Sequence, residues 1–93
     1  MEEDYCDRMA LIGKALSDPT RVNILIMTGG RPFTISALLE NMDTYQSNIS
    51  YHVSVLWKAG LLERVDEGRW HNYKVSEKAM ADIAEFLRVC GGD

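Results

Sequence analysis

Apolar residues recur along most of the chain every three or four positions, and short polar breaks separate these stretches, which is the pattern of amphipathic helices joined by turns. Asp18 is expected to cap the second helix, because Pro19 suits a first helical position, where its missing N–H would be unpaired anyway. Val22, Leu25 and Ile26 are the apolar positions that the pattern assigns to that helix. The predicted helices cover about 3–16, 19–30, a short stretch capped by Thr34, 46–58 and 77–90.

Two stretches favour strands instead of helices. Residues 61–65 and 70–75 are joined by the polar segment 66–69, in which Gly68 holds a plausible turn position of a hairpin. The predicted fold is therefore α+β and mainly helical, a winged helix-turn-helix with five helices and a two-stranded hairpin wing between the fourth and fifth helices. No repeat or linker divides the chain, so residues 1–93 are expected to form a single domain.

Composition and charge change this picture in two ways. The apolar runs are too short to cross a bilayer, and the acidic start lacks the basic and apolar segments of a secretory signal, so a cytoplasmic location is expected. The net charge of −4 counts against a nucleic-acid partner. However, no carboxylate lies between Asp43 and Glu63. A local window of this kind is what an approach to phosphate requires.

The predicted helix over 46–58 lies inside this window and has two distinct faces. A helical wheel places Ile49, Val53 and Leu56 together as the buried face. The rest of the surface carries hydrogen-bonding groups and one lysine, which suit base edges and phosphates, whereas a face that only meets water usually carries mixed charges. The predicted DNA-contacting residues of this helix are Gln46, Ser47, Asn48, Ser50, Tyr51, Ser54 and Lys58.

The hairpin is a weaker candidate for DNA contact than the helix. The basic residues of the hairpin, expected to be able to reach phosphates or a minor groove, are Arg64, Arg69, His71 and Lys74, and Arg69 beside the turn glycine is the best placed of them. The acidic residues Glu63, Asp66 and Glu67 share the hairpin and oppose this role. His52, on the flank of the buried helix face, is expected to be a histidine hydrogen-bonded near the core.

Three segments, in this order, resemble the ArsR/SmtB family of bacterial and archaeal repressors. They are ALSDPTR (15–21), QSNISYHVSVL (46–56) followed by KAGLL (58–62), and EGRWHNY (67–73). The resemblance implies that the second segment is the recognition helix and the third the wing. It also implies a homodimer formed through the helices 3–16 and 77–90, which binds operators of two-fold symmetry. Tyr51 departs from the family, which often has arginine there, so its base preference is expected to differ.

The resemblance does not carry over a metal sensor. The family's paired cysteines correspond to Thr34 and Ser36, which are poor ligands for soft metals, and the last helix has no histidine. No metal or other cofactor is therefore expected, and the effector stays unidentified. Cys6 and Cys90 have two interpretations: small apolar residues packed at the dimer interface, or a thiol switch between the terminal helices.

The expected function is sequence-specific DNA binding by a dimeric transcriptional repressor that reads a palindromic operator with the helix 46–58. The chain has no glycine-rich phosphate loop, zinc-protease motif or nucleophile elbow, so no catalytic residues are expected and an enzyme is not predicted. The alternative is a winged helix used for protein–protein docking without strong DNA binding, which the net negative charge would favour.

Overall fold

The computed structural model describes residues 3–92, and it confirms the predicted winged helix-turn-helix. The elements are α1 (Glu3–Ala15), α2 (Pro19–Gly30), α3 (Ile35–Glu40), α4 (Gln46–Lys58), β1 (Leu62–Glu67), β2 (Trp70–Val75) and α5 (Glu77–Cys90). The strand β1 extends further than predicted, to Glu67, so that only Gly68 and Arg69 form the turn. Gly68 adopts a φ of 60°, the left-handed conformation that a two-residue hairpin turn requires.

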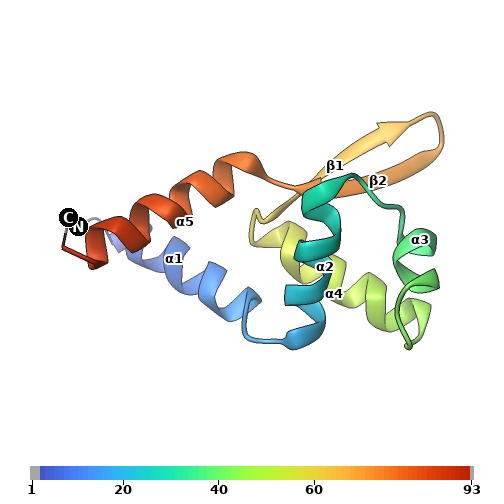
Figure 1. Ribbon diagram of the computed structural model, residues 1–93, viewed down its shortest axis with the longest axis horizontal. Helices are drawn as coiled ribbons and strands as arrows, with labels where there is room; N and C mark the ends of the chain where they lie inside the picture. The colour runs from blue at the N-terminus through green and yellow to red at the C-terminus, as the bar shows by residue number, and fades with distance from the viewer. Residues whose placement is uncertain (1–2, 93) are drawn as a thin grey trace.

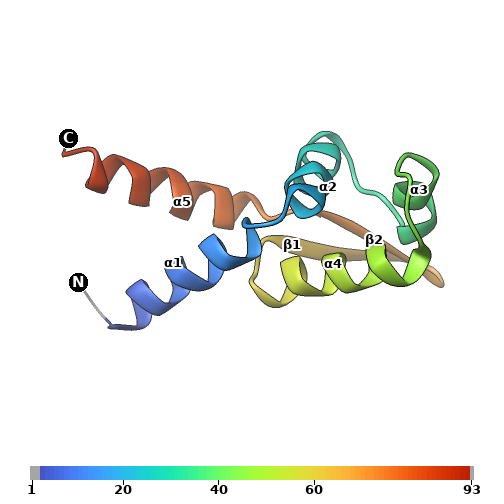
Figure 2. The same ribbon diagram turned by 90° about the horizontal axis from the view of Figure 1, so that it is seen from below.

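Helices α2, α3 and α4 and the hairpin form one body, from which α1 and α5 extend in the same direction (Figures 1 and 2). We call α1 and α5 the terminal pair. Arg8 Nη1 donates a hydrogen bond to Asp82 Oδ2 at 2.8 Å, and the rings of Tyr5 and Phe86 lie 6.3 Å apart, so the two helices run side by side. Among residues 3–92, no helix is long and apolar enough to cross a membrane.

The core lies between α2, α3 and α4 and the start of the hairpin. Ile49, Val53 and Leu56 of α4 are buried as predicted, and they pack with Leu38 of α3 and Ile24 of α2. Because α4 is anchored by this one face, its opposite face is turned away from the core. The core therefore decides which side chains of α4 are available to a partner.

The face of α2 that is buried differs from the face that the apolar positions in the sequence indicate. Ile24 is fully buried together with Thr28, whereas Val22 is exposed and the side chain of Ile26 is 71% exposed. The Thr28 hydroxyl donates to the Ile24 carbonyl oxygen at 2.7 Å, which satisfies it inside the core. Apolar residues occur on every side of this helix, so their spacing alone does not identify the buried face.

Arg21 of α2 connects α1 to α4 through a buried guanidinium group. Its Nε donates to the carbonyl oxygen of Ala15 at 2.7 Å and its Nη2 to that of Lys14 at 3.3 Å, at the end of α1. Its Nη1 donates to Nδ1 of His52 on α4 at 3.1 Å. Arginine only donates, so this imidazole nitrogen is the acceptor. His52 is therefore the hydrogen-bonded histidine near the core that the sequence predicts.

Replacing Arg21 with methionine should destabilise the fold, because the substitution leaves the two helix-end carbonyls and His52 without their donor. Hydrogen bonds to a charged group contribute about 1.5–3 kcal/mol, so we expect the free energy of unfolding to fall by about 2–4 kcal/mol in urea denaturation. Arg31→Met is the matched control, since that guanidinium lies on the Phe33 ring at the surface and should change stability by less than about 1 kcal/mol. Equal effects of the two substitutions would contradict the connecting role of Arg21.

Candidate nucleic-acid interface

The face of α4 that points away from the core carries the predicted contact residues. Tyr45 is the N-cap and makes no side-chain capping hydrogen bond, and no acidic residue lies in the first turn of the helix. Along the helix, Ser47 and Lys58 are exposed, and Tyr51 is 60% exposed. The predicted residues divide into an exposed group, Gln46, Ser47, Tyr51 and Lys58, and a half-buried group, Asn48, Ser50 and Ser54.

Two of these side chains already have partners within the protein. Asn48 Nδ2 donates to the Thr44 hydroxyl at 2.8 Å, which ties the start of α4 to the turn before it. The Tyr51 ring lies edge-on to His52 at 5.2 Å, on the flank of α4 that faces α1. Asn48 therefore shapes the turn of the helix-turn-helix, and Tyr51 is held in place by the group that Arg21 anchors.

The short helix α3 is positioned against α4 by local and core contacts. The Thr34 hydroxyl accepts a hydrogen bond from the Ala37 N–H at 3.1 Å, which is the predicted cap. Leu38 is fully buried between α3 and α4. Asn41 ends the helix, and its Nδ2 donates to the carbonyl oxygen of Ala37 at 2.8 Å. These contacts fix the angle between the two helices of the motif.

In the hairpin, one carboxylate is shared by two of the basic side chains predicted to contact DNA. Asp66 Oδ1 lies 3.1 Å from Arg64 Nε and 2.8 Å from His71 Nδ1. Arg69 is exposed at the turn and forms no ion pair with any residue in the range 3–92. The expectation that Arg69 is the best-placed residue of the wing is consistent with this arrangement.

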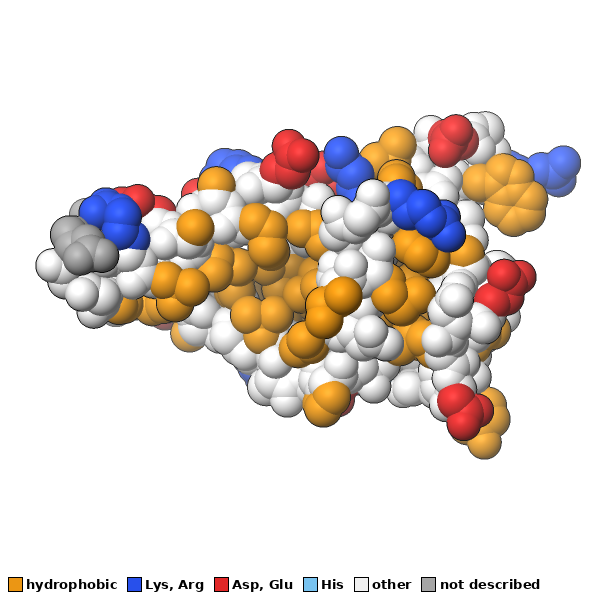
Figure 3. Space-filling view, viewed as in Figure 1, with side chains coloured by type: hydrophobic (Ala, Val, Ile, Leu, Met, Phe, Trp, Pro, Cys, Tyr) orange, Lys and Arg blue, Asp and Glu red, His pale blue; other side chains and the backbone are white. Residues whose placement is uncertain are grey.

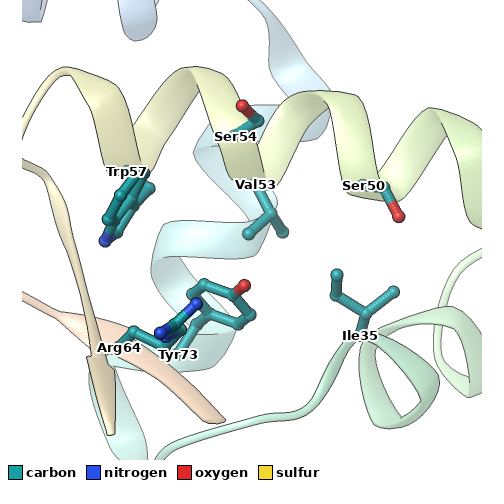
Figure 4. A pocket seen from close by; sticks show the side chains of 7 residues that line it. All are labelled: Ile35, Ser50, Val53, Ser54, Trp57, Arg64 and Tyr73. Carbon is teal, nitrogen blue, oxygen red and sulfur yellow. The ribbon is translucent and has the colours of Figure 1, made fainter. Parts of the chain in front are cut away.

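A pocket of about 130 Å³ opens between α3, α4 and the hairpin. Trp57 and Tyr73 line it, and neither was predicted as a site residue. Trp57 lies two helical turns after Ser50, so a helical wheel would have placed it on the same flank of α4. Tyr73 is positioned by two backbone hydrogen bonds to Phe33, at 2.9 and 2.8 Å, which no local sequence signal reveals. Figure 4 shows the lining: Ile35, Ser50, Val53, Ser54, Trp57, Arg64 and Tyr73.

Comparison with known proteins gives consistent matches over these elements. A helix-turn-helix domain model matches residues 16–65. A probable mercury resistance operon repressor of Streptomyces lividans is 30% identical over 89 residues, which cover 94% of this chain and 70% of the relative. The structure of an ArsR-like transcriptional regulator from Rhodococcus sp. RHA1 matches with a TM-score of 0.88 and 28% identity, over 98% of this chain and 84% of that chain. The chain belongs to the ArsR-like family of helix-turn-helix regulators.

This ArsR-like protein is a DNA-binding transcriptional regulator, as the sequence predicts. Its fold is also that of a homodimeric winged helix-turn-helix DNA-binding domain from Mycobacterium bovis, with a TM-score of 0.77 and 23% identity over 92% of this chain and 80% of that chain. The family model covers α2, α3 and α4 in full and reaches into β1. The part of the chain that the family model matches thus includes all the candidate contacts on α4.

The cysteines of this ArsR-like regulator lie far from α4. Cys6 and Cys90 are both exposed, and both line an apolar groove between the helices of the terminal pair together with Tyr5, Met9 and Phe86. Figure 3 shows apolar side chains gathered over this part of the surface. Within residues 3–92, no three or more His, Cys, Asp or Glu side chains form a cluster that could hold a metal ion.

The pairing of Asp66 in the wing predicts a measurable pKa shift. The hydrogen bond from His71 lowers the pKa of Asp66 below its ordinary value of 3.8, partial desolvation raises it, and the charge of Arg64 lowers it further. A carboxyl group with a lowered pKa stabilises the fold at pH values above its unfolded-state pKa, and this stabilisation is lost as the pH falls through its folded-state pKa. Asp66 therefore stays ionised and paired at neutral pH. We expect His71→Ala to raise the Asp66 pKa toward 3.8 in a carbon-13 NMR titration.

Asp82 provides the internal control for this titration. The hydrogen bond from Lys78 is the largest influence and lowers the pKa of Asp82, desolvation raises it, and the hydrogen bond from Arg8 lowers it further. All of these groups belong to the terminal pair. The pKa of Asp82 should therefore not respond to His71→Ala. An Asp66 pKa that stays in place, or one that moves together with that of Asp82, would show that His71 does not hold the carboxylate.

Proposed function

We propose that this regulator is a cytoplasmic homodimer that represses transcription by binding a palindromic operator, and that it acts through binding and not through catalysis. The observation that carries the proposal is the outward face of α4, which has no carboxylate from Gln46 to Lys58 while the opposite face is buried. Such a helix can enter the major groove without repelling the phosphates. The name of the Streptomyces relative, a repressor, supports the direction of the control.

Within this proposal the contact residues have different roles. Gln46 and Ser47, exposed at the start of α4, face base edges, and Tyr51 contacts the duplex from the flank beside α1. Lys58, at the end of α4, faces a phosphate. Asn48, Ser50 and Ser54 are half-buried and contact the duplex from the flanks of α4. In the wing, Arg69 reaches the neighbouring groove, and Arg64 and His71 contact the backbone from beside Asp66.

Dimerisation through the terminal pair is part of the proposal, with residues 1–93 acting as one domain. Leu11 on α1 is 50% exposed, and Leu87 and Val89 on α5 are 62% and 44% exposed. A domain of this size cannot bury such side chains by itself, and a second copy related by two-fold symmetry would cover them. The homodimeric state named for the mycobacterial neighbour supports this arrangement.

The proposed function is tested by selecting bound fragments from a pool of host DNA. We expect a palindrome whose half-sites lie about one helical turn apart, because each protomer of the dimer presents one α4. The alternative, a docking module for other proteins, is distinguished by binding to random duplex at low salt. Binding that weakens steeply with salt supports DNA contact, and no binding even at low salt would overturn the proposal in favour of docking.

A carboxylate introduced on α4 should weaken DNA binding without unfolding the protein. Ser47→Glu places a negative charge on the exposed first turn, where it favours the helix but faces the duplex. Since like charges across an interface cost several kcal/mol, we expect at least about a tenfold loss of affinity for duplex DNA in fluorescence anisotropy titrations.

Ala81→Glu is the matched control for this substitution. Ala81 is exposed on the face of α5 that also carries Glu85 and Arg88, on the helix that lies outside the proposed reading surface. The affinity of Ala81→Glu for DNA should stay within about twofold of the wild type, because this position does not contact the duplex in the proposed complex. Equal losses for the two substitutions, or no loss for Ser47→Glu, would contradict the assignment of α4.

Leu87→Glu should separate the dimer, because it places a charge in the apolar surface that the second copy covers. We expect analytical ultracentrifugation to show a monomer at a concentration where the wild type and Ala81→Glu are dimers. Operator affinity should fall at least about tenfold, since each particle then offers one reading helix in place of two. A dimer that persists in Leu87→Glu would contradict the proposed interface.

The cysteines report on the same interface. We propose that Cys6 and Cys90 act as small apolar residues covered in the dimer, so a thiol reagent should label Leu87→Glu faster than the wild type. The thiol-switch interpretation predicts a different result. In that case diamide would change the operator affinity of the wild type and leave that of Cys90→Ser unchanged.

A further inference from the structure

The pocket between α4 and the hairpin combines charge, hydroxyl groups and apolar surface in one place. Arg64 and Tyr73 are directly opposite each other in the register of β1 and β2, so their side chains share one face of the hairpin. They face Trp57 and Val53 of α4 across the open space in Figure 4. The cavity, of about 130 Å³, is therefore lined by one cation and a phenol on the hairpin side, and by apolar surface with the hydroxyls of Ser50 and Ser54 on the other.

The guanidinium of Arg64 has donors to spare. Its Nε lies 3.1 Å from Asp66 Oδ1, and neither of its two Nη groups donates a hydrogen bond to a residue in the range 3–92. The hydroxyl groups of Tyr73, Ser50 and Ser54 likewise make no hydrogen bond within that range. All of these groups are at least partly accessible, so a ligand that enters the pocket meets several donors.

The position of the pocket selects the ligand. In the proposed complex α4 enters the major groove, so a sugar–phosphate strand borders α4 on each side. The pocket opens on the flank of α4 that faces the hairpin, so one of these strands passes beside it. Each unit of that strand consists of an anionic phosphate and an apolar sugar, which matches the two kinds of lining.

We propose that the pocket binds one deoxyribose–phosphate unit of the operator backbone in each half-site. The phosphate oxygens accept hydrogen bonds from the Nη groups of Arg64 and from the Tyr73 hydroxyl, and the sugar packs on Trp57. This inference rests on the proposed function and adds Tyr73 and Trp57 to its binding residues. Contacts of this kind fix the register of the protein on the duplex and carry no base preference.

Two substitutions separate the charge from the hydroxyl. Arg64→Met should lower affinity for operator and random duplex alike, by about tenfold, and reduce the slope of log affinity against log salt by about one. Tyr73→Phe should lower affinity about threefold to tenfold and leave the salt slope unchanged, because it removes a neutral donor. Its ring and its backbone pairing with Phe33 stay in place, so the fold is retained.

Lys78→Met is the matched control for Arg64→Met. Lys78 shares the carboxylate of Asp82 with Arg8, in the same way that Arg64 shares Asp66 with His71, but it lies on α5. Both substitutions remove one positive charge and leave one partner on the carboxylate. Equal effects of the two on affinity and salt slope would overturn the proposal, because the loss would then reflect net charge alone.

Single methylphosphonate substitutions along the operator locate the contact. Replacing one phosphate per half-site with this neutral group should weaken wild-type binding to the same extent as Arg64→Met does on unmodified DNA. At that position the Arg64→Met protein should lose no further affinity, whereas at all other contacted positions both proteins should lose affinity alike. Additive losses of variant and modification at every position would overturn the proposal.

Two further results distinguish the possible failures. If the wild type binds no DNA, the proposed function itself fails; if it binds and the Arg64→Met and Tyr73→Phe variants match it, only the pocket assignment fails. Titration of inorganic phosphate into Trp70→Phe, in which Trp57 is the sole tryptophan, separates a backbone phosphate from a free one. We expect no change in Trp57 fluorescence below millimolar phosphate, and saturation at micromolar phosphate would overturn the assignment to DNA.

Discussion

The arrangement of this small protein depends on the buried guanidinium of Arg21. None of its hydrogen bonds goes to a carboxylate; they go to two carbonyl oxygens at the end of α1 and to His52 on α4. The helix end supplies a partial negative charge that favours the cation there. A buried cation is tolerated only when all of its partners are in place, so the direction of α1 and the rotation of α4 are fixed together. The same contact therefore orients the terminal pair and turns the polar face of α4 outward.

Features of the fold that depend on short-range chemistry could be predicted from the sequence. Asp18 accepts from the Thr20 N–H, and the Thr34 hydroxyl accepts from the Ala37 N–H, as the capping patterns predict. The rotation of α2 could not be predicted in this way. Arg21 and Thr28 are polar, and their burial depends on acceptors supplied by α1 and by the helix backbone itself.

The same division holds for the candidate site. The two faces of α4 follow from periodicity, because the burial of Ile49, Val53 and Leu56 leaves only one surface for a partner. The pocket between α4 and the hairpin does not follow from periodicity, because Tyr73 reaches it through backbone pairing with Phe33, far away in the sequence. The charge of the wing was only half predictable: the opposing acids were visible, but the convergence of Arg64 and His71 on Asp66 depends on the register of β1 and β2.

The pairing at Asp66 has a consequence for how such a protein finds its target in a cell. A genome offers millions of competing sites, and every one of them presents the same phosphates. Asp66 offsets part of the positive charge of the wing, so the proposed attraction of the wing to any duplex is weaker than its basic side chains alone would make it. In the proposed complex, occupancy of the regulated gene then depends more on how well a particular sequence fits α4.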